Sequence, residues 1–120
     1  MKNRIRFISH KHKKILLVDG TGCSPEQLQE LAELVPARVT AEPKGSVLLL
    51  ADFTGVQFDK KSFERFKPAL VRDRPHLKRS AWVGMEGLPK IFYEHMKNFS
   101  QRDLPTFKTR EEALDWLVAD

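Results

Sequence analysis

The last third of the chain, residues 81–117, constrains the fold more than any other stretch. It reads as a strand, a glycine turn, an amphipathic helix, a short strand and a second helix, with few residues left for irregular loops. Strands that alternate with helices are usually joined by right-handed crossovers into a mostly parallel sheet covered by helices. The rhythm therefore predicts an α/β fold and leaves the activity open.

The first half of the chain continues this rhythm. Residues 4–8 alternate apolar and charged side chains, which predicts a half-buried edge strand, and residues 15–19 are apolar on both faces, as in a central strand. The two strands should form an antiparallel hairpin with its turn at residues 9–13. Ser24, followed by proline, predicts a helix start, and this helix should stop before Pro36.

Two further strand–helix units follow. A strand at residues 46–52 leads to a helix that Asp59 can cap and that Pro68 should kink or shorten. The next strand spans residues 77–83, and a last short strand spans 104–107. The helices should bury apolar stripes at helical spacing. These stripes are Phe63, Phe66 and Leu70 in the middle helix, Leu88, Ile91, Phe92, Met96 and Phe99 in the next, and Ala113, Leu114 and Leu117 in the last, which Thr109 and Glu112 should open as a capping box.

Length and charge limit the classes of protein that fit. A chain of 120 residues matches one domain, 1–120. Residues 1–14 hold six of the 21 lysines and arginines and no acid, so a basic edge strand and turn precedes a nearly neutral body, 15–120. A nucleic-acid binder usually carries its basic face across the fold, so this distribution argues against a nucleic-acid partner.

Cysteine content and hydropathy bear on the compartment. The single Cys23 excludes an internal disulfide, and residues 47–51 form the longest purely apolar run, far short of the ~20 residues that a membrane helix needs. We therefore expect a cytoplasmic protein without a membrane span. Cys23 precedes a helix start, which could lower the pKa of its thiol, although a small residue in a turn is the simpler interpretation.

One pattern, Leu-Leu-x-Asp-x-Thr-Gly, occurs twice, at residues 16–22 and 49–55. Each copy ends a predicted strand, so its Asp and Thr should lie at the carboxyl edge of the sheet, where ligands bind in open α/β folds. The glycine turn at 84–87 should lie there too. Two interpretations stay open: a shallow site for an anion or a partner, or side chains that only stabilise their own turns.

No catalytic constellation appears in the sequence. Asp19 has no second carboxylate beside it, and Phe53 interrupts the Asp-Thr-Gly order of aspartic proteases. His10 and His12 lack a third metal ligand, and no Ser or Cys stands in a histidine-partnered motif. We therefore expect no enzyme, no cofactor and no metal.

Three pieces of the chain together resemble the STAS-like, SpoIIAA-like domains, which are related to anti-sigma-factor antagonists. They are residues 15–19 with Ser24-Pro25-Glu26, residues 47–55, and residues 81–88 with the Phe99-Ser100, Arg102-Asp103, Phe107, Thr109, Glu111-Glu112-Ala113 and Trp116-Leu117 pieces. The resemblance implies a non-enzymatic α/β domain that binds a protein partner or a small apolar or anionic ligand.

The chain departs from that family at the phosphorylation motif. Anti-sigma-factor antagonists carry a phosphorylated serine in a motif like Asp-Ser-Ser-Gly at the start of the helix after the second core strand. Here the matching residues are Asp59-Lys60-Lys61-Ser62, so a lysine stands at the acceptor position and use of Ser62 would be a different switch. Lysines at a helix start oppose the macrodipole but could attract an anion.

These observations favour a non-catalytic regulatory domain that acts by protein–protein interaction. The expected binding edge comprises Asp19, Thr21, Asp52, Thr54, Gly55, Asp59, Lys60, Ser62, Gly84 and Gly87. The alternative is a carrier that holds a small apolar or anionic ligand in a groove between the helices at 63–70 and 88–99. A homodimer is left open, and a helix face would suit its contact better than the charged edge strand.

Overall fold

The strands form one five-stranded sheet in the order in which they occur along the chain. The computed structural model describes residues 2–102 and 104–119. Strand β1 (Ile5–His10) runs antiparallel to β2 (Lys13–Asp19), and all other neighbours are parallel. The parallel strands are β2, β3 (Val47–Asp52), β4 (Leu77–Val83) and β5 (Thr106–Phe107). This mixed α/β sheet with an antiparallel edge confirms the predicted fold class.

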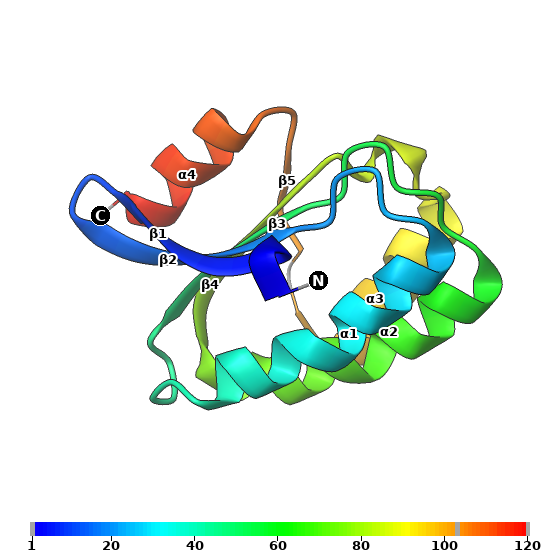
Figure 1. Cartoon of the computed structure of the whole chain (residues 1–120), viewed down its shortest axis with the longest axis horizontal. Coiled ribbons are helices and arrows are strands. Elements are labelled where there is room, and N and C mark those ends of the chain that lie inside the picture. The colour runs from blue at the N-terminus through cyan, green and yellow to red at the C-terminus, as the bar shows by residue number, and fades with distance from the viewer. Residues whose placement is uncertain (1, 103, 120) are drawn as a thin grey trace.

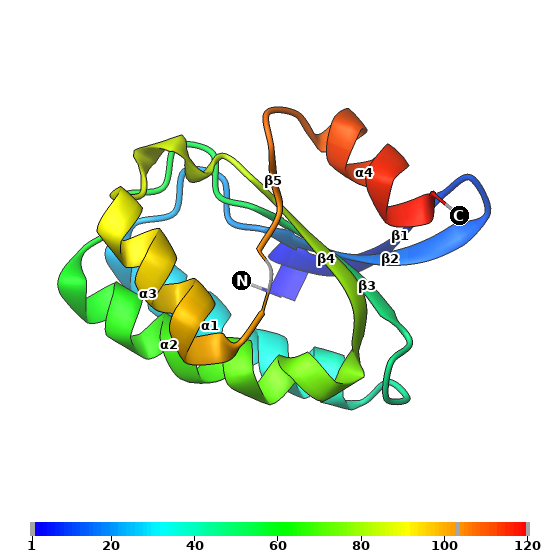
Figure 2. The ribbon, with the colours of Figure 1, turned by 180° about the vertical axis from the view of Figure 1, so that it is seen from behind.

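Four helices cover the two faces of the sheet unequally. Helices α1 (Pro25–Thr40), α2 (Lys60–Asp73) and α3 (Lys90–Ser100) lie together on one face, and α4 (Arg110–Val118) lies alone on the other (Figures 1 and 2). Short 3-10 helices span Lys2–Arg4, Arg74–His76 and Met85–Gly87. None of the helices within the described residues combines the length and the apolar character that crossing a membrane requires.

Alternate residues of the central strands supply two separate cores. Leu16 and Val18 of β2 join the larger core under α1, α2 and α3, whereas Ile15 and Leu17 pack in the smaller core under α4. β3 divides its side chains in the same way, and all six of its residues are buried. Burial on both faces explains why these strands are continuously apolar in the sequence.

The two prolines expected to limit helices do not end them. The prediction that the first helix stops before Pro36 is wrong, because α1 continues through it to Thr40. Val39, beyond the proline, is fully buried, and the Thr40 hydroxyl donates to the Pro36 carbonyl at 2.7 Å. Helix α2 likewise runs through Pro68 to Asp73. Burial of the last turns offsets the hydrogen bond that each proline removes.

The apolar stripe expected on α3 is only partly correct. Met96 is buried, but Ile91 is 71% exposed and Phe99 is 51% exposed. Leu88 is also buried, but it precedes α3, which begins at Lys90. The prediction that Ile91 and Phe99 face the core is therefore wrong. α3 is the last helix of its layer and packs against α2, so only one side of it is covered (Figure 2).

The N-terminal hairpin is tighter than expected. β1 extends to His10 and β2 begins at Lys13, which leaves a two-residue turn, Lys11 and His12, in place of the predicted residues 9–13. Both turn residues have positive φ values, 50° and 68°. This geometry suits the twist of a hairpin, and neither residue belongs to the types that usually signal such a turn.

Candidate functional site

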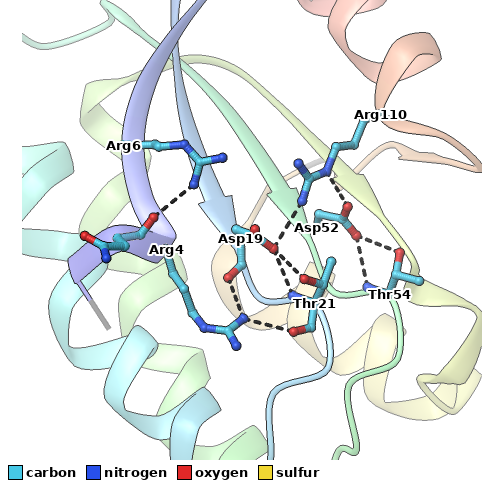
Figure 3. Close-up of polar contacts among 8 residues, drawn as sticks. Arg4, Arg6, Asp19, Thr21, Asp52, Thr54 and Arg110 are labelled. Atoms are coloured by element: carbon cyan, nitrogen blue, oxygen red, sulfur yellow. Dashed lines mark hydrogen bonds and ion pairs between the residues drawn. The ribbon is translucent and has the colours of Figure 1, made fainter.

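The two Asp-x-Thr-Gly copies form matching turns at the carboxyl ends of β2 and β3. In the first, Asp19 Oδ1 accepts the Thr21 N–H at 3.2 Å and the Thr21 hydroxyl at 2.7 Å. In the second, Asp52 Oδ1 accepts the Thr54 N–H at 3.0 Å and its hydroxyl at 2.7 Å. Asp19 and Asp52 are register partners, so the two turns lie side by side (Figure 3).

Backbone hydrogen bonds join the loops that follow β2, β3 and β4. Gly20 N–H donates to the Asp52 carbonyl at 2.8 Å, and Phe53 N–H donates to the Val83 carbonyl at 2.8 Å. Gly84 has a φ of 77° and lies so close to Thr54 that a Cβ atom there would be 2.3 Å from the Thr54 nitrogen. The carboxyl edge is therefore one closely packed unit rather than three independent loops.

Arg110 connects the joined turns to α4, which lies on the face of the sheet opposite α1, α2 and α3. It is the first residue of α4, and its guanidinium contacts Asp52 Oδ2 at 2.6 Å and Asp19 Oδ1 at 3.1 Å (Figure 3). A cation in the first turn of a helix works against the macrodipole, so the two carboxylates offset an unfavourable placement. No motif in the sequence predicted a role for Arg110. The one sequence feature that marks it is its basic side chain directly after the Thr109 cap.

A second arginine holds the same edge from the N-terminal side. Arg4 Nη1 donates to the Asp19 carbonyl at 3.1 Å and to the Thr21 carbonyl at 2.9 Å (Figure 3). The alternation of residues 4–8 predicted only that Arg4 lies on the charged face of an edge strand. Its contact shows that part of the basic N-terminal excess supports the Asp19 turn.

The electrostatics of the turn carboxylates follow from these contacts. Burial by itself raises the pKa of Asp19, but the Thr21 hydrogen bonds and the Arg110 charge outweigh it and hold that pKa below its ordinary value. For Arg110, the carboxylates outweigh burial, and its pKa is raised. Asp19 is therefore held as a charged hydrogen-bond acceptor and is poorly suited to carry a proton in general acid–base chemistry at neutral pH.

The start of α2 belongs to the same edge and has its own closed hydrogen-bond pattern. Asp59 Oδ1 accepts the Ser62 N–H at 2.7 Å, and the Asp59 N–H donates to Ser62 Oγ at 3.1 Å, a complete capping box. Ser62 is fully buried. Hydrogen bonding from the Ser62 backbone N–H, and after it from the Ser62 side chain, lowers the pKa of Asp59. Ser62 therefore caps a helix and offers no exposed hydroxyl.

The predicted site residues fall into three neighbouring groups. The structure brings Asp19, Thr21, Asp52, Thr54, Gly55 and Gly84 together in the joined turns, places Asp59, Lys60 and Ser62 at the start of α2, and places Gly87 in the 3-10 helix after β4. Gln57 N–H donates to the Cys23 carbonyl at 3.4 Å, which links the loop before α2 to the loop before α1.

Cys23 is a buried residue of this edge, 1% exposed. Burial raises the pKa of its thiol. The alternative that the helix start lowers this pKa is therefore wrong, because removal from water disfavours the thiolate.

An open groove of about 440 Å³ adjoins the glycine turn. Its walls are Met85, Glu86 and Leu88 after β4, Lys90 and Tyr93 of α3, and Thr106, Phe107 and Lys108 around the end of β5. The groove combines apolar surface with two lysines. Of its walls, only the segment Gly84–Leu88 was predicted from the sequence to lie at the binding edge. Among residues 2–102 and 104–119, no three His, Cys, Asp or Glu side chains gather as a metal site.

The mixed α/β architecture agrees with the comparison against known families. The family described as SpoIIAA-like matches residues 16–118, nearly the whole chain. The chain belongs to the SpoIIAA-like family. Searches of curated proteins and of solved structures gave no match. SpoIIAA-like domains are STAS-like, generally non-catalytic and commonly engaged in protein interactions.

Proposed function

We propose that this SpoIIAA-like domain is a non-catalytic binding module that recognises a protein partner through the carboxyl edge of its sheet. The observation that carries the proposal is the state of the two turn carboxylates. Asp19 and Asp52 are bound by their own threonines and by Arg110, so they shape the edge and neither stands free as an acid or base.

The rim of this edge presents the groups that a partner would contact. Thr54, Gly55 and Gln57 are exposed, and so are Lys60 and Lys61 at the start of α2. The first turn of α2 contains no acidic residue, and Asp59, the N-cap next to these lysines, accepts the Ser62 N–H. The adjoining 440 Å³ groove adds apolar surface. We expect the partner to bring an acidic group to α2 and an apolar side chain to the groove.

Site-specific cross-linking tests this proposal. A photo-cross-linking amino acid replaces Gln57, which is exposed at the carboxyl edge, and in a matched control it replaces Ala37, which is exposed on α1. We expect discrete protein adducts from position 57 and none of these from position 37. The partner identified by mass spectrometry is then purified, and its affinity should fall about tenfold or more in Lys60→Glu, the equivalent of ~1.4 kcal/mol.

Identical adducts from the two positions would contradict the proposal. So would turnover of esterase, phosphatase or nuclease substrates that disappears in Asp52→Asn, because that result would make the turn carboxylate a catalytic group.

The region between α2 and α3, where the carrier alternative places a small ligand, has little free space. The rings of Phe63 on α2 and Phe92 on α3 stack with centroids 4.8 Å apart. Phe66 packs against Phe53 and Trp82. The internal cavity beside Phe66 holds about 20 Å³, room for about one water molecule. These contacts favour the partner-binding proposal over a lipid-like ligand between α2 and α3.

A further inference from the structure

A second open cleft lies at the other end of β4, away from the carboxyl edge, and has a volume of about 610 Å³. We call it the basic cleft. It is defined by its cations: Arg74, Lys78, Arg79, Lys97 and Arg102. No acidic residue lines it within the described part of the chain.

The cleft follows from the shortness of β5. This strand pairs only with Trp82 and Val83, so residues 78–81 of β4 have no neighbouring strand on that side within residues 2–102 and 104–119. The described residues 101, 102, 104 and 105 between α3 and β5 line the cleft together with residues 77–80 of β4. The side chains of α3, β4 and this connection therefore surround a hollow instead of a continuous sheet edge.

Two arginines of the cleft are held rigidly. Arg102 is 7% exposed, and it donates to the Leu70 carbonyl at 3.1 Å and to Ser80 Oγ at 3.0 Å. Arg79 donates to the carbonyls of Trp116 and Ala119, each at 2.9 Å. Positive charge is thereby fixed in the cleft before any ligand arrives.

The other three cations have no acidic partner among the described residues. Arg74 and Lys78 are exposed and Lys97 is half-buried, and within the described residues no carboxylate lies within 4.0 Å of their charged nitrogens. Burial lowers the pKa of Arg102 to about 10, and repulsion from Arg74 acts in the same direction. Asp73, which attracts Arg102, lines the internal cavity and not the cleft. Like charges that converge in a cleft with no acidic residue among its described lining favour binding of an anion.

We propose that the basic cleft binds a small organic polyanion that carries two or more phosphate or carboxylate groups. Its volume lies within the range of ~300–1,000 Å³ found for small-molecule sites. Its cations converge in one hollow, whereas an extended basic track would suit a nucleic acid. The basic cleft shares Tyr93 with the groove beside the glycine turn, but none of its five cations lines that groove, so the proposal stands independently of the protein-partner function.

Titration calorimetry with inorganic tripolyphosphate, and then with citrate, tests the proposal on the full chain. The double variant Lys78→Gln/Lys97→Gln removes two charges from the cleft. The matched control Lys11→Gln/Lys14→Gln removes two charges from the N-terminal hairpin, where the side chains are 65% and 62% exposed. We expect the affinity for tripolyphosphate to fall about tenfold or more in the cleft variant, because the anion loses charge-assisted hydrogen bonds from two lysines. In the control the affinity should fall by less than about threefold.

Thermal unfolding with and without tripolyphosphate provides a second readout. The anion should raise the melting temperature of the natural protein and of the hairpin control, and should raise it much less in the cleft variant. Tighter binding of tripolyphosphate than of citrate assigns a phosphorylated ligand, and the reverse order assigns a polycarboxylate. Equal weakening in the two double variants, or no binding to the natural protein, would overturn the proposal.

Discussion

Arg110 reaches from α4 on one face of the sheet to carboxylates at the ends of β2 and β3. The Arg110 side chain is 37% exposed, but that of Asp52 is only 6% exposed. Removing the cation would leave a buried carboxylate without its charged partner, which costs more than the pair itself contributes. At the scale of single residues, the stability of the carboxyl edge therefore depends on this arginine.

We expect Arg110→Ala to lower the free energy of unfolding by about 1–3 kcal/mol at pH 7, because a buried acceptor loses its charged donor. Urea denaturation measures the loss. Lys108→Ala, an exposed change two residues earlier, should stay within about 0.5 kcal/mol of the natural protein. In a double-mutant cycle, Asp52→Asn should cost less in the Arg110→Ala background, and strict additivity would show that the pair does not interact.

Gly84 offers a second residue-scale prediction. Gly84→Ala should destabilise the domain by about 3 kcal/mol or more, because left-handed backbone costs about 1–2 kcal/mol and the new methyl group would collide with the Thr54 backbone. Gly45 shares the positive φ, at 69°, but has open space around it. Gly45→Ala should therefore lose only the backbone part. Equal losses in urea denaturation would contradict the close approach of the two turns.

At the scale of elements, the starts of α1, α2 and α4 agree with their cap residues, whereas two helix ends do not agree with their prolines. Ser24 and Asp59 form complete capping boxes. The box predicted at Thr109 is only half formed, because the Thr109 side chain accepts the Glu112 N–H and its hydroxyl donates to Glu112 Oε1 at 3.2 Å. α1 and α2 nevertheless pass through Pro36 and Pro68. A cap depends on neighbouring residues, whereas continuation past a proline depends on how much apolar surface the next turn buries.

Helix α3 has a buried side and an exposed side, and the two should contribute differently to stability. Met96→Ala should lower the free energy of unfolding by about 2–5 kcal/mol, because Met96 is 1% exposed and its truncation leaves a cavity. Ile91→Ala, on the exposed side of the same helix, should change it by about 0.5 kcal/mol or less. Chemical denaturation of both variants measures the difference. A large loss for Ile91→Ala would restore the interpretation that the whole apolar stripe is core.

At the scale of the whole molecule, Asp73 and Asp19 make stability depend on pH in opposite directions. Burial raises the pKa of Asp73 to about 6, although the nearby charges of Arg102, Arg72 and His76 oppose it. Its Oδ1 atom has no hydrogen-bond partner within the described residues. The folded protein therefore binds this proton more tightly than the unfolded chain and loses stability as the pH rises from about 4 to 6. The lowered pKa of Asp19 does the reverse, since its contribution is lost below the ordinary carboxyl range.

Asp73→Asn should remove the first of these two effects. Asparagine cannot ionise, so the Asp73→Asn variant lacks the loss of stability that ionisation of Asp73 causes. We expect the free energy of unfolding of the variant, relative to that of the natural protein, to improve by about 2–3 kcal/mol between pH 4 and pH 7.5, because the pKa of Asp73 rises to about 6 on folding. Asp19 is present in both proteins, so its effect cancels in the comparison. Urea denaturation at the two pH values measures the change, and parallel pH profiles would contradict it.

Much of the candidate edge was predictable because it follows from strand order. Parallel neighbours bring Asp19 and Asp52 to the same end of the sheet, and the repeated Asp-x-Thr-Gly pattern predicted both turns. The contribution of Arg110 could not be predicted in this way, because 58 residues separate it from Asp52. Arg4 is a similar case, since its partners are carbonyl groups, which every residue carries.

The sequence by itself determined the types and order of the elements, the capped helix starts and the two-sided burial of the central strands. These properties depend on residue periodicity and on neighbours within about one helical turn. Only the tertiary structure decided that α4 covers the second face alone, that one side of α3 stays exposed and that five cations surround the cleft beside β4. Those outcomes depend on which distant segments pack together, and no local pattern encodes the direction from which a partner element arrives.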